Sequence, residues 1–135
     1  MTRVELDDYY LLQDMITECE ENIAKAEALL YGSPHFDTNG VSSTPSPQNR
    51  VENAYIKIIE QKNELLAKKA EYERLKVLVE QYISNIGELF VRRIFEKRFI
   101  QRKRWSEIAD ELGGQNTAGS VSKICYRYLE KHPNG

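Results

Sequence analysis

Apolar residues recur every seven positions along one long stretch rich in charged residues, and this repeat limits the chain to long, paired helices. The stretch runs from residue 47 to about residue 83, and the members of the repeat are Val51, Ile58, Leu65, Tyr72 and Val79. On an α-helix this spacing places the side chains in one stripe, which must pack along another helix. Ser46 and Pro47 supply a capping residue and a proline suited to the first turn. The spacing therefore predicts a long helix over 47–83.

A second apolar stripe lies earlier in the chain, over residues 5–31. Its members alternate three and four residues apart: Tyr9, Leu12, Ile16, Cys19, Ile23, Ala26 and Leu30. Residues 32–49 contain three of the four prolines among Ser, Thr, Asn and Gly, a composition typical of a flexible connector. We therefore expect an antiparallel, coiled-coil-like helical hairpin over residues 1–83, with a connector at 32–49.

The two expected helices differ in length, which raises the question of what covers the longer one. A helix of about 35 residues is roughly 50 Å long, more than the first helix can cover. One interpretation is that the stripe of Val51, Ile58, Leu65, Tyr72 and Val79 contacts another subunit, most simply in a homodimer. The alternative is an intramolecular bundle, in which the C-terminal helices fold back onto the hairpin.

The C-terminal part, residues 84–135, is expected to form three shorter helices. Asn85 and Glu88 have the spacing of a cap that starts the first of them, at about 86–100, with Leu89, Phe90, Ile94 and Phe99 as inward candidates. The second is expected at 105–112 and the third at 117–131. Their apolar faces are Trp105, Ile108, Ala109 and Leu112 for the second, and Val121, Ile124, Cys125, Tyr128 and Leu129 for the third.

The junction between the second and third helices has the features of a helix-turn-helix. Ala109 is small enough to let two helices approach closely, and Gly113 can adopt the left-handed conformation that ends a helix. Asn116 or Thr117 can cap the third helix. A plain helical hairpin with a glycine turn would show the same local pattern, so the neighbouring charges must distinguish the two.

Charge is unevenly distributed along the chain. Residues 1–87 contain 9 Lys and Arg against 15 Asp and Glu, whereas residues 88–131 contain 10 against 6. A basic end on an otherwise acidic chain favours a nucleic-acid contact there. We expect the third helix to present Thr117, Ser120, Ser122, Lys123, Tyr126 and Arg127 to double-stranded DNA. We expect phosphate contacts from Arg98, Arg102, Lys103 and Arg104.

The segments RFIQRKRWSEIADELGG and SVSKICYRYLEK resemble region four of bacterial sigma factors. With SPQNRVENAYIKIIE at the start of the long helix, the whole order resembles small phage-encoded transcription regulators of the ArpU and RinA type. The resemblance implies a regulator of phage gene expression that acts beside host RNA polymerase. Two features depart from the sigma pattern: Arg104 occupies the position where Ser or Thr usually caps the second helix, and the turn before Val121 is longer.

Other chemistry is not indicated. No Cys and His set has zinc spacing, no Ser–His–acid set can be assembled around His35 and His132, and the carboxylates are spread over helix surfaces, so we expect no metal, no cofactor and no enzyme activity. Cys19 and Cys125 each lie in an apolar helical stripe and are expected to be buried free thiols. The absence of a long apolar run or a signal peptide favours a cytoplasmic protein, in a bacterial host cell, without membrane contact.

The sequence thus predicts an all-α, DNA-binding transcriptional regulator that dimerises through its long helices. One alternative is a viral DNA-packaging recognition subunit similar to a small terminase, which would form rings of many subunits. Another is a helical adaptor that binds a protein and never contacts DNA.

Overall fold

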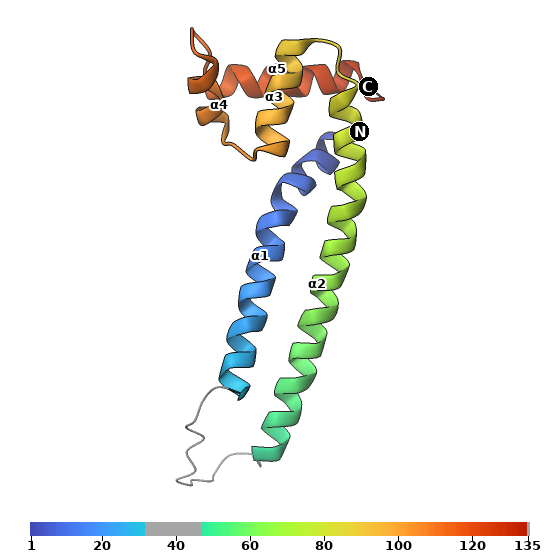
Figure 1. Cartoon of the computed structure of the whole chain (residues 1–135), viewed down its shortest axis with the longest axis vertical. Helices are drawn as coiled ribbons and strands as arrows, with labels where there is room; N and C mark the ends of the chain where they lie inside the picture. Colours follow the sequence, from blue (N-terminus) through green and yellow to red (C-terminus); the bar gives the residue numbers. More distant parts are fainter. Residues whose placement is uncertain (32–46, 135) are drawn as a thin grey trace. The chain divides into compact units, whose positions relative to one another are not determined.

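A computed structural model of the chain describes residues 1–31 and 47–134. These residues form helices and contain no strand, so the all-α prediction is confirmed. The helices are labelled in Figure 1: α1 (Arg3–Tyr31), α2 (Pro47–Ser84), α3 (Leu89–Phe95), the π-helical turn η1 (Glu96–Ile100), α4 (Trp105–Leu112) and α5 (Ala118–Lys131). Most of the predicted connector, with His35, lies outside the described residues.

The chain divides into two compact units. One contains residues 1–13 and 71–135, and the other contains residues 14–70. This division differs from the expected boundary at residue 84, because the start of α1 and the end of α2 belong to the same unit as the C-terminal helices. The alternative in which C-terminal helices pack on the long helices therefore describes the first unit better than a separate C-terminal module does.

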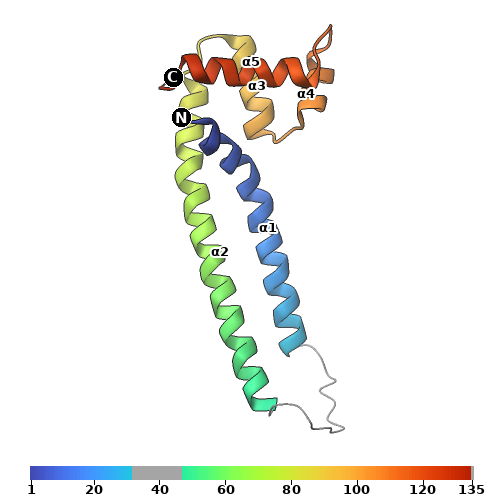
Figure 2. The same ribbon diagram turned by 180° about the vertical axis from the view of Figure 1, so that it is seen from behind.

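Within the unit of residues 14–70, α1 and α2 run side by side in opposite directions (Figures 1 and 2). The Nζ atom of Lys62 lies 3.6 Å from Oε1 of Glu27, and that of Lys69 lies 3.6 Å from Oε2 of Glu20. The later lysine of α2 pairs with the earlier glutamate of α1, so the two helices are antiparallel. Ile58 is buried here.

Part of the stripe expected to form a subunit interface is covered within the chain. Ile58 and Val79 are only 5% and 0% exposed. The ring of Tyr72 stacks on that of Tyr9, with centroids 5.1 Å apart, and Val51 and Leu65 are half-buried. The assignment of Ile58 and Val79 to an oligomer interface is therefore wrong, because both side chains are buried within the chain. The assignment of Val51, Leu65 and Tyr72, which are only half-buried, stays a prediction.

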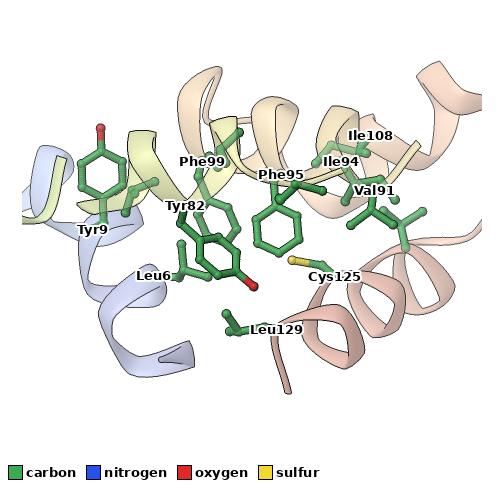
Figure 3. Packing of buried hydrophobic residues seen from close by; sticks show 14 of the residues in the cluster. Leu6, Tyr9, Tyr82, Val91, Ile94, Phe95, Phe99, Ile108, Cys125 and Leu129 are labelled. Atoms are coloured by element: carbon green, nitrogen blue, oxygen red, sulfur yellow. The ribbon is translucent and has the colours of Figure 1, made fainter. Parts of the chain in front are cut away.

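The larger unit has an aromatic core, shown in Figure 3. Phe95 is fully buried, with its ring centroid 5.7 Å from that of Tyr82 and 6.0 Å from that of Tyr128. Leu6 from α1 and Cys125 from α5 are also fully buried in this cluster. Buried residues of five helices, α1 to α5, meet in this cluster. Burying each large apolar side chain contributes about 1.5–3 kcal/mol, so the cluster holds these helices together.

The first C-terminal helix begins later than expected. Its N-cap is Glu88, and Asn85 instead forms the turn that directly follows α2, with its backbone N–H bonded to the Gln81 carbonyl. Leu89 and Phe90 are 74% and 47% exposed, so their expected inward position is wrong. Ile94 and Phe99, the other two inward candidates, are buried as predicted.

None of the helices formed by residues 1–31 and 47–134 combines the length and apolar character needed to span a bilayer.

Candidate nucleic-acid interface

Helix α4 has the bounds predicted from the sequence, 105–112, and ends at a glycine turn. Its buried face includes Ile108 and Ala109. Gly113 ends the helix with φ 71° and ψ −164°, and its N–H donates to the Ala109 carbonyl at 3.0 Å. Gly114 also has a positive φ, of 66°. Such backbone angles strongly favour glycine, which explains the double glycine at this turn.

Helix α5 begins with a reciprocal cap. The backbone N–H of Ser120 donates to Oγ1 of Thr117 at 3.1 Å, and the N–H of Thr117 donates to Oγ of Ser120 at 2.8 Å. Thr117, rather than Asn116, is therefore the N-cap. The hydroxyl of Ser122 donates to the Gly119 carbonyl at 3.0 Å. The three hydroxyl residues expected to face DNA thus also stabilise the first turns of α5.

One face of α5 packs against α3 and α4 (Figures 1 and 2). That face consists of Val121, Cys125 and Leu129, all buried. Lys123 and Arg127 lie on the exposed side, four residues apart, and residues at this spacing are neighbours on a helix surface. The helix is therefore fixed by its apolar stripe and presents two cations outward.

Tyr126 does not lie on a free face, as the sequence had suggested. Its hydroxyl donates to Oδ1 of Asp7 at 2.8 Å, and its ring meets that of Trp105 edge-on with centroids 5.8 Å apart. The Cζ atom of Arg3 lies 3.8 Å above the ring. Burial, followed by the hydrogen bond to Asp7, raises the pKa of Tyr126. Tyr126 therefore holds α5 to the start of α1, a correction to its expected contact with bases.

Two of the four expected phosphate contacts face the protein instead. The Cζ atom of Arg98 lies 3.8 Å from the ring centroid of Tyr10 and 4.5 Å from that of Trp105. Nη2 of Arg102 donates to the Tyr10 carbonyl at 2.9 Å. Arg102 also has a positive φ of 59°. Both guanidinium groups therefore pack on α1, and their assignment to DNA phosphates is corrected.

The other two expected phosphate contacts form ion pairs with α4. Lys103 Nζ lies 2.5 Å from Oε1 of Glu111. The same oxygen lies 2.9 Å from Nζ of the buried Lys97. Hydrogen bonds from Lys103 and then Lys97 hold the pKa of Glu111 below its ordinary value. Arg104 Nε lies 2.9 Å from Oε1 of Glu107, but its side chain is 80% exposed. Of the four, Arg104 alone remains well placed for an outside anion.

The exposed cations of α5 border an open hollow of about 440 Å³ in the larger unit. Its lining combines three cations with two aromatic rings, one hydroxyl and one carboxylate: Arg3, Lys123, Arg127, Trp105, Tyr126, Ser122 and Glu130. The formal charge of the lining is +2, from three cations and one carboxylate. The hollow can therefore receive an anionic group.

Arg3 is the part of this surface that sequence reasoning missed. It is separated from Tyr126 by more than a hundred residues, and the acidic composition around it gave no indication of a role near α5. Its contact with Tyr126 depends on the packing of α1 against α5, which no local motif encodes.

Among residues 1–31 and 47–134, no group of His, Cys, Asp and Glu is arranged to hold a metal ion. Cys19 and Cys125 are free thiols, as predicted. Cys125 is buried as expected, but Cys19 is only half-buried. Burial raises the pKa of Cys125 to about 12. The ring of His132 packs on that of Tyr128, with centroids 4.4 Å apart.

Comparisons with known proteins assign no family to the chain. No family model matches it, and neither a curated protein nor a solved structure does.

Proposed function

We propose that this protein is a transcriptional regulator that binds double-stranded DNA with α5 as the recognition helix of a helix-turn-helix. Helix α4 packs through Ile108 and Ala109, the chain turns at Gly113, and α5 docks through Val121 and Cys125. At 14 residues α5 is roughly 21 Å long. The major groove of B-DNA is wide enough to admit an α-helix with exposed polar side chains.

The observation that carries the proposal is the pair of exposed cations on the outer face of α5. Lys123 and Arg127 project from the side opposite the buried stripe, and the hollow beside them has a positively charged lining. Arginine and lysine on a recognition helix can bond either guanine edges or phosphates. The two cations and the positive lining together give the outer face of α5 a charge that suits a DNA duplex.

The sequence resemblance supports the biological setting of the proposal. It suggests a phage- or prophage-encoded regulator of the ArpU and RinA type, which acts in the bacterial cytoplasm beside host RNA polymerase. The structure leaves large apolar residues exposed on α2, including Ile56, Ile59 and Leu66, which are 54%, 54% and 64% exposed. Large exposed apolar side chains favour protein contacts. We infer that a homodimer forms through this side of α2, in place of the stripe that α1 covers.

The test is the salt dependence of duplex DNA binding, measured by fluorescence anisotropy with a mixed-sequence duplex. Each phosphate contact contributes about −0.9 to the slope of log K against log salt. Lys123→Ala combined with Arg127→Ala should weaken binding. If both cations bind phosphates, the variant should also flatten the slope by about 1.8. The matched control, Lys25→Ala with Lys57→Ala, removes the same charge from exposed positions in the other unit.

Equal loss of affinity in the two double variants would show that binding follows net charge alone, and would contradict a role for α5. An adaptor that never contacts DNA would show no binding by the unmodified protein even at low salt. The mass in solution separates the remaining alternative, because a DNA-packaging recognition subunit would form a ring much larger than a dimer.

A further inference from the structure

The start of α1 contributes a cation to the hollow beside α5. Arg3 lines this hollow together with Lys123 and Arg127 of α5. All three residues belong to the same compact unit, and the side chain of Arg3 is 65% exposed. Cations from two helices that are distant in sequence therefore border one concave surface.

The guanidinium of Arg3 is held in place by its neighbours. Its Cζ atom lies 3.8 Å from the ring centroid of Tyr126, a distance at which the ring attracts the cation. Its Nε atom lies 3.6 Å from Oδ2 of Asp7, whose other oxygen accepts the Tyr126 hydroxyl at 2.8 Å. This pair holds Arg3 beside the hollow, and its side chain is still 65% exposed, so an incoming anion can reach it.

We propose that the hollow binds a backbone phosphate of DNA and that Arg3 supplies one of its cations. The proposal rests on the function proposed above and extends the DNA-binding surface from α5 to the start of α1. A guanidinium can bond a phosphate through two parallel N–H groups. The carboxylate of Glu130 also lines the hollow, but the three cations leave the lining at +2.

The position of Arg3 suits a phosphate better than a base. Its guanidinium stacks on the ring of Tyr126 and therefore stays beside α5, near Lys123 and Arg127. A contact of this kind positions the protein on the duplex without selecting a sequence. We therefore expect Arg3 to contribute equally to binding of any duplex, with an effect that decreases as salt rises.

The experiment compares Arg3→Gln, Arg3→Lys and Arg74→Gln with the unmodified chain, using the same anisotropy assay at about 50 and about 200 mM salt. Arg3→Gln should flatten the slope of log K against log salt by about 0.9. Over this fourfold rise in salt, the variant should therefore lose about 3.5-fold less affinity than the unmodified chain loses. Arg3→Lys keeps the charge and should restore the slope. Arg74 is an exposed arginine paired with Glu71 and does not line the hollow, so its variant should retain the original slope.

The outcomes separate this inference from the function on which it rests. If the Lys123 and Arg127 variant loses DNA affinity but Arg3→Gln retains the original slope, the inference is wrong and the proposed function stands. If Arg3→Gln weakens binding without changing the slope, Arg3 acts only by packing on Tyr126, and the phosphate contact is likewise refuted. If the unmodified chain binds no DNA at low salt, both proposals fall.

Discussion

Replacing Gly113 with alanine is expected to destabilise the protein, although the added methyl group meets no atom. A Cβ built on Gly113 has nothing within 4 Å, so steric conflict with neighbouring groups does not contribute. The cost comes from the backbone, which has φ 71° and ψ −164° at this position. Glycine tolerates this region, whereas residues with a Cβ essentially do not occupy it.

The expected size follows from two opposing terms. Holding a non-glycine residue in such a conformation costs about 1–3 kcal/mol. Alanine also restricts the unfolded chain, which offsets about 0.4–1 kcal/mol of that cost. With both terms near the middle of their ranges, the net loss at Gly113 should be about 1–2 kcal/mol. With a urea dependence of about 2 kcal/mol per molar, the midpoint of urea unfolding should fall by roughly 0.5–1 M.

Gly119 provides a matched control for this measurement. It lies in the first turn of α5, and a Cβ there would meet only the Thr117 Oγ1 atom, at an ordinary 3.9 Å. Alanine is the better helix former by up to about 1 kcal/mol, so Gly119→Ala should leave the midpoint unchanged or raise it. A Gly113→Ala protein as stable as the unmodified chain would refute the positive φ and, with it, the turn that positions α5.

Two further measurements test the interior and the charged network. The thiol of Cys125 is buried and its pKa is raised to about 12, so in native protein at pH 8 only the half-buried Cys19 should be alkylated. Mass spectrometry would show which cysteine is labelled, and rapid labelling of both would contradict the packing of α5. Hydrogen bonds from Lys103 and Lys97 lower the pKa of Glu111 from 4.5 in the folded protein. The ionised carboxylate therefore stabilises the protein above pH 4.5, and this contribution is lost as the pH falls through the pKa of the folded state. The difference in urea midpoint between the unmodified protein and Glu111→Gln should therefore shrink below pH 4.5, and a constant difference would argue against the ion pairs.

Local features of this fold were predictable because they depend on neighbours in sequence. The bounds of α4 follow from its apolar spacing, and the turn follows from a double glycine at 113–114. The cap at Thr117 was one of two candidates, and side-chain hydrogen bonds to the backbone favour it over Asn116. By contrast, Asn85 and Glu88 had the spacing of a cap, but Asn85 forms the turn that directly follows α2, with its backbone N–H bonded to the Gln81 carbonyl. Competition between two helix ends is not visible in a short motif.

The candidate site was harder to predict because its charged residues have two uses. In the sequence, seven cations within thirteen residues indicate a phosphate-binding surface. In the structure, Arg98 and Arg102 instead contact Tyr10, whose ring and carbonyl come from a helix about ninety residues earlier. A guanidinium stacks on an aromatic ring as readily as it binds a phosphate. The composition of the segment is the same in both cases, so only the tertiary packing decides which cations remain exposed.

The heptad pattern of α2 shows the same ambiguity for apolar residues. A stripe such as Ile58 and Val79 requires a helical partner but does not specify whether that partner belongs to the same chain. Here α1 supplies it, since Tyr9 stacks on Tyr72 and both stripe residues are buried. The residues of α2 that can contact a second subunit therefore lie outside this stripe, on another side of the helix. A helix paired on one side can still dimerise on another, so the intramolecular packing changes the expected dimer surface without removing the reason to expect a dimer.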